Sequence, residues 1–181
     1  MSRYSFKHTL IFIISLLVST PVFATIEPIS SSSRLGDGII KLYNTHSSEF
    51  ESIQYRASDG QYLEDGISKV NYMFRCKMND EETNIEPGLI ELLDEIEDHF
   101  SRGPLQIVSG YRSPEYNAML RAKGRRVAKE SFHMSGFAVD LRLPGVPLSK
   151  VRDFARSLHA GGVGYYPKRW VHLDVGPERH W

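Results

Sequence analysis

Strict alternation of side chains marks two segments of the sequence, residues 137–143 (FAVDLRL) and 170–175 (WVHLDV). Because the side chains of a β-strand point to opposite faces in turn, a period of two is typical of strands that bury one face. The opposite face of these two segments carries groups that can bind a metal ion, namely Asp140, His172 and Asp174. The alternation therefore predicts two strands of a sheet, with one face on the core and the other available for chemistry.

Turn residues and hydrophobic spacing predict the other helices and strands. Pro87 is expected to begin a helix whose apolar stripe extends to Phe100, and Gly124 is expected to end another helix. The predicted strands are residues 38–43, 50–55, 105–108, 137–143, 163–166 and 170–175, and the predicted helices are residues 67–74, 87–100, 114–123 and 148–158. Helices before and between strands indicate an α+β fold in which an antiparallel sheet carries helices on one face.

Size and charge restrict the class of protein. The chain has 181 residues, 41% of them hydrophobic, which suits one core, so we expect a single domain over residues 38–181. Its 22 basic and 22 acidic side chains argue against a nucleic-acid partner, which requires a basic excess. The basic run at residues 121–129 is expected to be a solvated helix end and loop; contact with a polyanionic matrix or a substrate carboxylate is the alternative. The lone Cys76 allows no intrachain disulfide.

The N-terminal residues have the composition of a signal peptide. A short basic segment, residues 1–8, precedes an apolar stretch of about ten residues, which is short for a bilayer span. Small residues then predict cleavage after Ala24, so that residues 1–24 are removed and residues 25–37 form a flexible leader. We therefore expect a periplasmic protein without stable membrane insertion; an uncleaved anchor is the alternative.

His133 completes a set of possible metal ligands with Asp140 and His172. His133 and Asp140 are seven residues apart, which is about 10 Å along a helix and about 23 Å along a strand, too far for a shared ion. The chain must fold back between them, and the turn-forming pair at residues 135–136 (SG) allows it. Two imidazoles and one carboxylate leave the fourth position of a tetrahedral zinc open for water, as a hydrolytic site requires.

Several motifs resemble those of a known class of peptidases. Residues 131–140 (SFHMSGFAVD), with residues 109–112 (SGYR) before them and 170–172 (WVH) after them, are similar to the D-Ala-D-Ala carboxypeptidase-like zinc metallopeptidases. These enzymes share their fold with lysostaphin-type peptidases and the hedgehog signalling domain. Residues 161–167 (GGVGYYP) and 171–177 (VHLDVGP) extend the similarity to the MepK (YcbK-like) murein endopeptidases, over nearly the whole mature chain.

This resemblance implies a hedgehog/D-Ala-D-Ala peptidase-like fold and an activity. His133, Asp140 and His172 would be the zinc ligands. Arg112 would hold the substrate or polarise its scissile carbonyl, and a capping or salt-bridging role is the alternative. The implied activity is zinc-dependent hydrolysis of peptidoglycan cross-links, between stem peptides that contain meso-diaminopimelate, by a metal-activated water. Neither the preferred cross-link nor the oligomeric state is indicated.

One position departs from the family pattern. Many relatives have Glu or Asp three residues before the last histidine ligand as general base, whereas this chain has Arg169, which cannot accept a proton. Asp174 is the first candidate to replace the missing general base, because it shares a strand face with His172 at a spacing of about 6.6 Å. Asp174 could equally orient His172 through a hydrogen bond. His180 is the second candidate for the base.

Two other functions remain open. A D,D- or L,D-carboxypeptidase acting on the same stem peptides would release a single D-amino acid without loss of cross-links. A non-catalytic, zinc-containing peptidoglycan-binding module would bind the wall without cutting it, and Arg169 in place of an acidic residue keeps this alternative open. The aromatic residues Tyr165, Tyr166 and Trp170 are expected to pack rather than to line a substrate groove.

Overall fold

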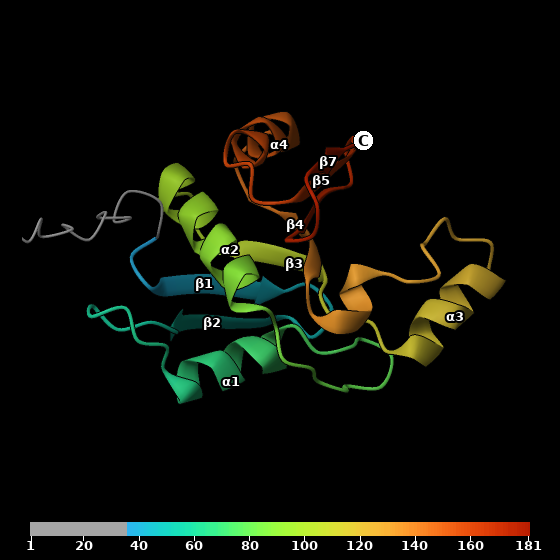
Figure 1. Cartoon of the computed structure of the whole chain (residues 1–181), viewed down its shortest axis with the longest axis horizontal. Coiled ribbons are helices and arrows are strands. Elements are labelled where there is room, and N and C mark those ends of the chain that lie inside the picture. Colours follow the sequence, from blue (N-terminus) through green and yellow to red (C-terminus); the bar gives the residue numbers. More distant parts are fainter. Residues whose placement is uncertain (1–35) are drawn as a thin grey trace, which may run out of the picture. The chain divides into compact units, whose positions relative to one another are not determined.

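The computed structural model describes residues 36–181, and this part of the chain contains a seven-stranded sheet (Figure 1). The strands are β1 (Ile39–Asn44), β2 (Glu49–Gln54), β3 (Leu105–Ser109), β4 (Ala138–Arg142), β5 (Gly162–Tyr166), β6 (Trp170–Asp174) and β7 (Arg179–His180), in the spatial order β2-β1-β3-β4-β6-β5-β7. The helices are α1 (Glu64–Met73), α2 (Pro87–Phe100), α3 (Pro114–Ala122) and α4 (Leu148–Ser157), with a 3-10 turn η1 (Phe132–Ser135). The predicted signal peptide at residues 1–24 and the leader up to residue 35 lie outside the described residues.

The sheet is mixed rather than wholly antiparallel. Four neighbouring pairs are antiparallel, but β1–β3 and β5–β7 are parallel. β1 and β3 can be parallel because the chain passes through β2, α1 and α2 before it enters β3, a long connection of the kind that parallel strands require. The α+β class is confirmed, and the expectation of an antiparallel sheet is corrected at these two pairs. The two residues of β7 are too few for a strand period to be recognised in the sequence.

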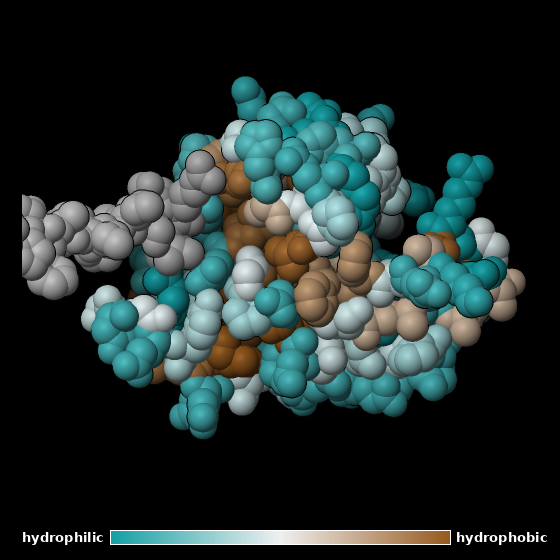
Figure 2. Space-filling model, in the orientation of Figure 1, coloured by the Kyte–Doolittle hydropathy of each residue, from teal (hydrophilic) through white to brown (hydrophobic). Residues whose placement is uncertain are grey.

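The helices α1, α2 and α4 contribute to one apolar core against one face of the sheet. Val139 and Leu141 of β4, with Val171 and Leu173 of β6, are fully buried in this core, which confirms the apolar face predicted from the alternation. Apolar side chains (brown) show in the seams between the helices, whereas α4 is covered by hydrophilic residues (teal; Figure 2). Covering this face leaves the opposite face of the sheet for polar groups. None of the helices within residues 36–181 has the length and apolar character needed to cross a bilayer.

α3 and the loop that follows it stand apart from the other helices (Figure 1). Ser113 caps α3, because its hydroxyl accepts a hydrogen bond from the backbone NH of Tyr116 at 3.2 Å, and Pro114 occupies the first turn. Gly124 follows the last turn with a φ of 69°, in agreement with the predicted end of this helix. We call residues 114–131 the arm; it leads into η1 and from there into β4.

Candidate metal centre

The turn η1 brings His133 to the polar face of the sheet. Gly136 ends η1 in the left-handed conformation (φ 76°), and a Cβ at this position would collide with the backbone carbonyl of Asn84. The backbone NH of Arg112 donates to the carbonyl of His133 at 3.1 Å, which ties η1 to the segment before the arm. The predicted fold-back between His133 and Asp140 is therefore made by a 3-10 turn that ends in glycine.

The side chains of His133, Asp140 and His172 converge on one point. Asp140 and His172 are direct partners in the register of β4 and β6, so their side chains lie together on one face. His172 Nδ1 lies 2.9 Å and His133 Nε2 lies 3.5 Å from Asp140 Oδ1, and the two nitrogens are 3.3 Å apart. Ligand atoms of a tetrahedral zinc lie about 3.3 Å apart, because each ligand bond is about 2.0 Å long. These donors therefore fit a zinc ion in spacing and in chemical type.

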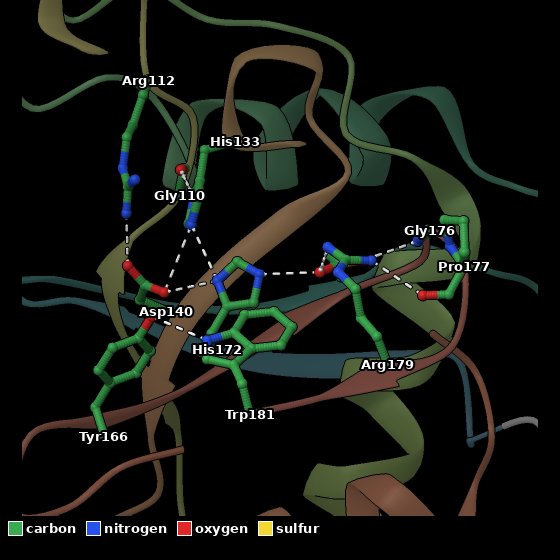
Figure 3. A network of polar contacts seen from close by, with 11 residues as sticks. Gly110, Arg112, His133, Asp140, Tyr166, His172, Gly176, Pro177, Arg179 and Trp181 are labelled. Carbon is green, nitrogen blue, oxygen red and sulfur yellow. Dashed lines mark hydrogen bonds and ion pairs between the residues drawn. The ribbon is translucent and has the colours of Figure 1, made fainter. Parts of the chain in front are cut away.

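A second hydrogen bond fixes each imidazole ring on its far side (Figure 3). His133 Nδ1 lies 2.7 Å from the carbonyl oxygen of Gly110, and His172 Nε2 lies 3.0 Å from Asp174 Oδ2. Because a carbonyl oxygen only accepts, Nδ1 of His133 carries the proton and Nε2 offers its lone pair. The carboxylate of Asp174 likewise places a proton on Nε2 of His172 and directs Nδ1 toward Asp140.

Asp174 is a buried anchor for His172. Its carboxylate accepts hydrogen bonds from Arg179 Nη1 at 3.1 Å, from Arg179 Nη2 at 2.7 Å and from the NH of Gly176 at 3.0 Å. The residue has no exposed surface. These donors and His172 occupy both oxygens of the Asp174 carboxylate. The carboxylate also lies on the side of the His172 ring that faces away from Asp140, so the geometry favours the orienting role over that of general base.

His180, the second candidate for the base, lies outside the site. Arg179 and Trp181, on either side of it, line the groove beside the metal-binding residues, but His180 does not. Its Nε2 is instead 3.6 Å from Glu178 Oε1. The geometry therefore does not favour His180 as the base, because strand alternation turns its side chain away from the groove.

Burial and hydrogen bonding set the charges of the site. Burial lowers the pKa of His133 below its ordinary value, so this imidazole is neutral near pH 7. Burial alone would raise the pKa of Asp140, but contacts with both histidines and with Arg112, whose Nη2 lies 2.6 Å from Oδ2, hold that pKa well below its usual range. Burial disfavours charge on His172, but hydrogen bonds to Asp140 and Asp174 outweigh it and raise its pKa. A carboxylate and a neutral imidazole are the forms that bind a metal, and at His172 a metal would compete with a proton.

A groove with a volume of about 890 Å³ opens beside the three donors. Arg112 lines this groove and also donates from Nε to the hydroxyl of Ser109 at 3.0 Å. Tyr165 packs against the core, as expected. Tyr166 and Trp170 line the groove, contrary to the expectation that they only pack, because they lie on the opposite side of the β5–β6 hairpin.

Two further residues of the site, Arg179 and Trp181, were not predicted. Trp181 donates from its indole Nε1 to the hydroxyl of Tyr166 at 3.1 Å, and its ring centroid lies 5.3 Å from that of His172. Gly164 of β5 makes room for this indole, since a Cβ there would collide with it. Arg179 and Trp181 are two residues apart, which is the spacing of side chains on one face of a strand. A segment this short is not enough to distinguish a strand period from a chance spacing.

Comparisons with known proteins identify the family of the chain. The model of the peptidase family described as Peptidoglycan L,D-endopeptidase MepK matches residues 33–181. The chain is 41% identical over 168 residues to the Peptidoglycan L,D-endopeptidase MepK of Escherichia coli (strain K12), an alignment that covers 91% of this chain and 88% of the relative. A protein of the same name from Shigella flexneri has the same identity and coverage. The Probable peptidoglycan L,D-endopeptidase MepK of Haemophilus influenzae is 40% identical over 118 residues, which cover 64% of this chain and 63% of the relative. The chain therefore belongs to the peptidase family of peptidoglycan L,D-endopeptidase MepK.

Proposed function

We propose that the chain is a zinc-dependent L,D-endopeptidase of the periplasm that hydrolyses peptide cross-links of peptidoglycan. The proposal rests above all on the triangle of His133 Nε2, Asp140 Oδ1 and His172 Nδ1, whose edges of 2.9, 3.3 and 3.5 Å suit one zinc ion. The names of the relatives supply the substrate and the L,D stereochemistry of the bond. The predicted signal peptide at residues 1–24 supports the location.

The residues of the chain would hold the ion and orient the substrate. When bound, zinc lowers the pKa of its water toward about 7 and polarises the scissile carbonyl. Asp174 and the carbonyl of Gly110 keep the two imidazoles in the orientation that binding requires. Arg112 lies against Asp140 and lines the groove, so its remaining N–H groups can donate to a carbonyl oxygen or a carboxylate of the substrate.

Digestion of cross-linked sacculi tests this function. The mature chain should convert muropeptide dimers into intact monomers, as identified by mass spectrometry, and a zinc chelator or His133→Ala should abolish the conversion. Release of a single D-amino acid with unchanged dimers would instead identify a carboxypeptidase. A protein that retains zinc and binds sacculi without any product would be a binding module.

The location has its own test. Protein isolated from the periplasmic fraction should begin at Thr25 when its N-terminus is sequenced, because cleavage is expected after Ala24. Protein that begins at Met1 and sediments with the membrane fraction would instead identify an uncleaved anchor.

A further inference from the structure

The groove beside the metal-binding residues carries an excess of positive charge, although the whole chain has 22 basic and 22 acidic side chains. Seven basic residues line the groove, against two acidic residues, Glu130 and Asp140. Two of the seven are already paired, Arg112 with Asp140 and Arg179 with Asp174. The other five form no ion pair with a carboxylate anywhere in residues 36–181. The groove therefore holds a positive charge that the protein itself does not neutralise.

Four of these five cations come from two different parts of the chain. Arg125 and Arg126 belong to the loop of the arm. Arg142 lies two residues after Asp140 in β4, so its side chain is on the same face of the sheet. Arg169 is in the turn between β5 and β6. The groove thus has one pair of cations from the arm and another pair from β4 and the β5–β6 turn.

Arg142 and Arg169 are held against the wall of the groove. Arg142 donates from Nε to the backbone carbonyl of Arg169, and the guanidinium of Arg169 lies over the Trp170 ring, 5.6 Å from its centroid. These contacts leave further N–H donors of both side chains unused. Like charges gathered in a groove repel one another, and an anionic ligand that binds there relieves the repulsion. Guanidinium groups suit carboxylates in particular, because their planar fork matches both oxygens.

We propose that the groove selects peptides with free carboxylates on both sides of the scissile bond, and that the enzyme discriminates against peptides in which these groups are amidated. This inference rests on the proposed function, because it assigns a preference to the same site. One carboxylate pairs with Arg125 and Arg126, and the other pairs with Arg142 and Arg169. A carboxamide cannot replace the carboxylate, because it is uncharged and its NH₂ group would meet only donors.

Two synthetic cross-linked peptides test the preference. One has free carboxylates beside the scissile amide, and the other has carboxamides at the same positions. We expect kcat/KM to be higher for the free peptide by about tenfold for each carboxylate, since a charge-assisted pair is lost at both positions on amidation. Equal kcat/KM values would overturn the proposal. If neither peptide is cut, the proposed function fails instead, and the preference is then measured as binding by calorimetry, where equal affinities would overturn it.

Replacing the arm cations shows whether they are responsible. The double variant Arg125→Gln/Arg126→Gln should lose about tenfold in kcat/KM on the free peptide and little on the amidated one. Arg121→Gln is the matched control, because Arg121 is exposed in the last turn of α3 and does not line the groove. Zinc content confirms that each variant keeps an intact metal centre. A double variant that retains the full preference, or that loses both activities in equal proportion, would contradict the role of the arm.

Discussion

Single residues of the candidate metal centre lie in pairs, in which one side chain could bind a metal and its partner orients it. Asp174 holds His172, Arg112 holds Asp140, and a backbone carbonyl holds His133. Such partners restrict the rotamers of the ligands, so the donor atoms converge before a metal arrives. The alternation in the sequence places Asp174 on the same strand face as His172. It could not indicate which ring nitrogen Asp174 meets, because that depends on side-chain torsions.

Asp174→Asn separates the orienting role from that of a base. We expect zinc affinity to fall about ten- to a hundredfold, because an amide is a weaker partner for His172 Nε2 and for Arg179. A competing chromophoric chelator measures the zinc affinity, and activity should return as the zinc concentration is raised. Absence of activity at full zinc occupancy would show instead that Asp174 transfers a proton. Asp153→Asn is the control, because Asp153 is exposed on α4 and, within residues 36–181, pairs only with Arg152.

Among the elements, those with a long internal period were predicted best. α2 has the predicted bounds, Pro87–Phe100, because a proline in the first turn and a four-turn apolar stripe are both visible in the sequence. The parallel pairing of β1 with β3 could not be predicted, because strand partners are chosen by contacts far apart in the sequence. η1 was foreseen only as a turn, since four residues carry no helical period.

Gly136→Ala tests whether this turn positions His133. We expect the variant to lose more than about 1 kcal/mol in the free energy of unfolding and to lose bound zinc, because the new Cβ would collide with the carbonyl of Asn84. Gly145→Ala is the matched control, since Gly145 has a φ of 75° but open space around it. Denaturant unfolding and zinc analysis compare the two variants. Equal effects on both quantities would mean that the close approach at Gly136 does not matter.

Asp94 of α2 makes stability depend on pH. Burial raises its pKa to about 6, and its carboxylate accepts hydrogen bonds from the NH of Gly38 at 2.9 Å and the hydroxyl of Tyr55 at 2.8 Å. The folded state therefore holds the proton more tightly than the unfolded state, whose carboxyl has a pKa near 3.8. The contribution of Asp94 to the free energy of unfolding is greatest below about pH 4, falls as the pH rises to about 6, and is constant above that.

Asp94→Asn should remove this dependence. Relative to the wild type, the variant should gain up to about 3 kcal/mol in the free energy of unfolding between pH 4 and pH 7. Urea unfolding of both proteins at the two pH values measures the change. A difference between the proteins that is the same at both pH values would contradict a raised pKa.

Across residues 36–181, the two faces of one sheet serve different purposes. The face under α1, α2 and α4 holds the apolar core, and the other face presents Asp140 and His172 beside the turn that carries His133. The alternation and the residue types could predict these three donors. They could not predict the groove, because its basic side chains come from separate segments that only the tertiary fold assembles. The basic run at residues 121–129 supplies part of the positive charge of the groove. The sequence shows this charge, but it does not show that the run lies beside the metal-binding residues.

Return of zinc to the metal-free protein, in measured equivalents, tests whether the three donors form a catalytic metal centre. Activity on cross-linked sacculi should rise in proportion to added zinc and stop rising at one zinc per chain. His133→Ala should bind less zinc and remain inactive, because it removes one corner of the donor triangle. Full activity of the metal-free wild type, or of His133→Ala, would contradict a catalytic role for this centre.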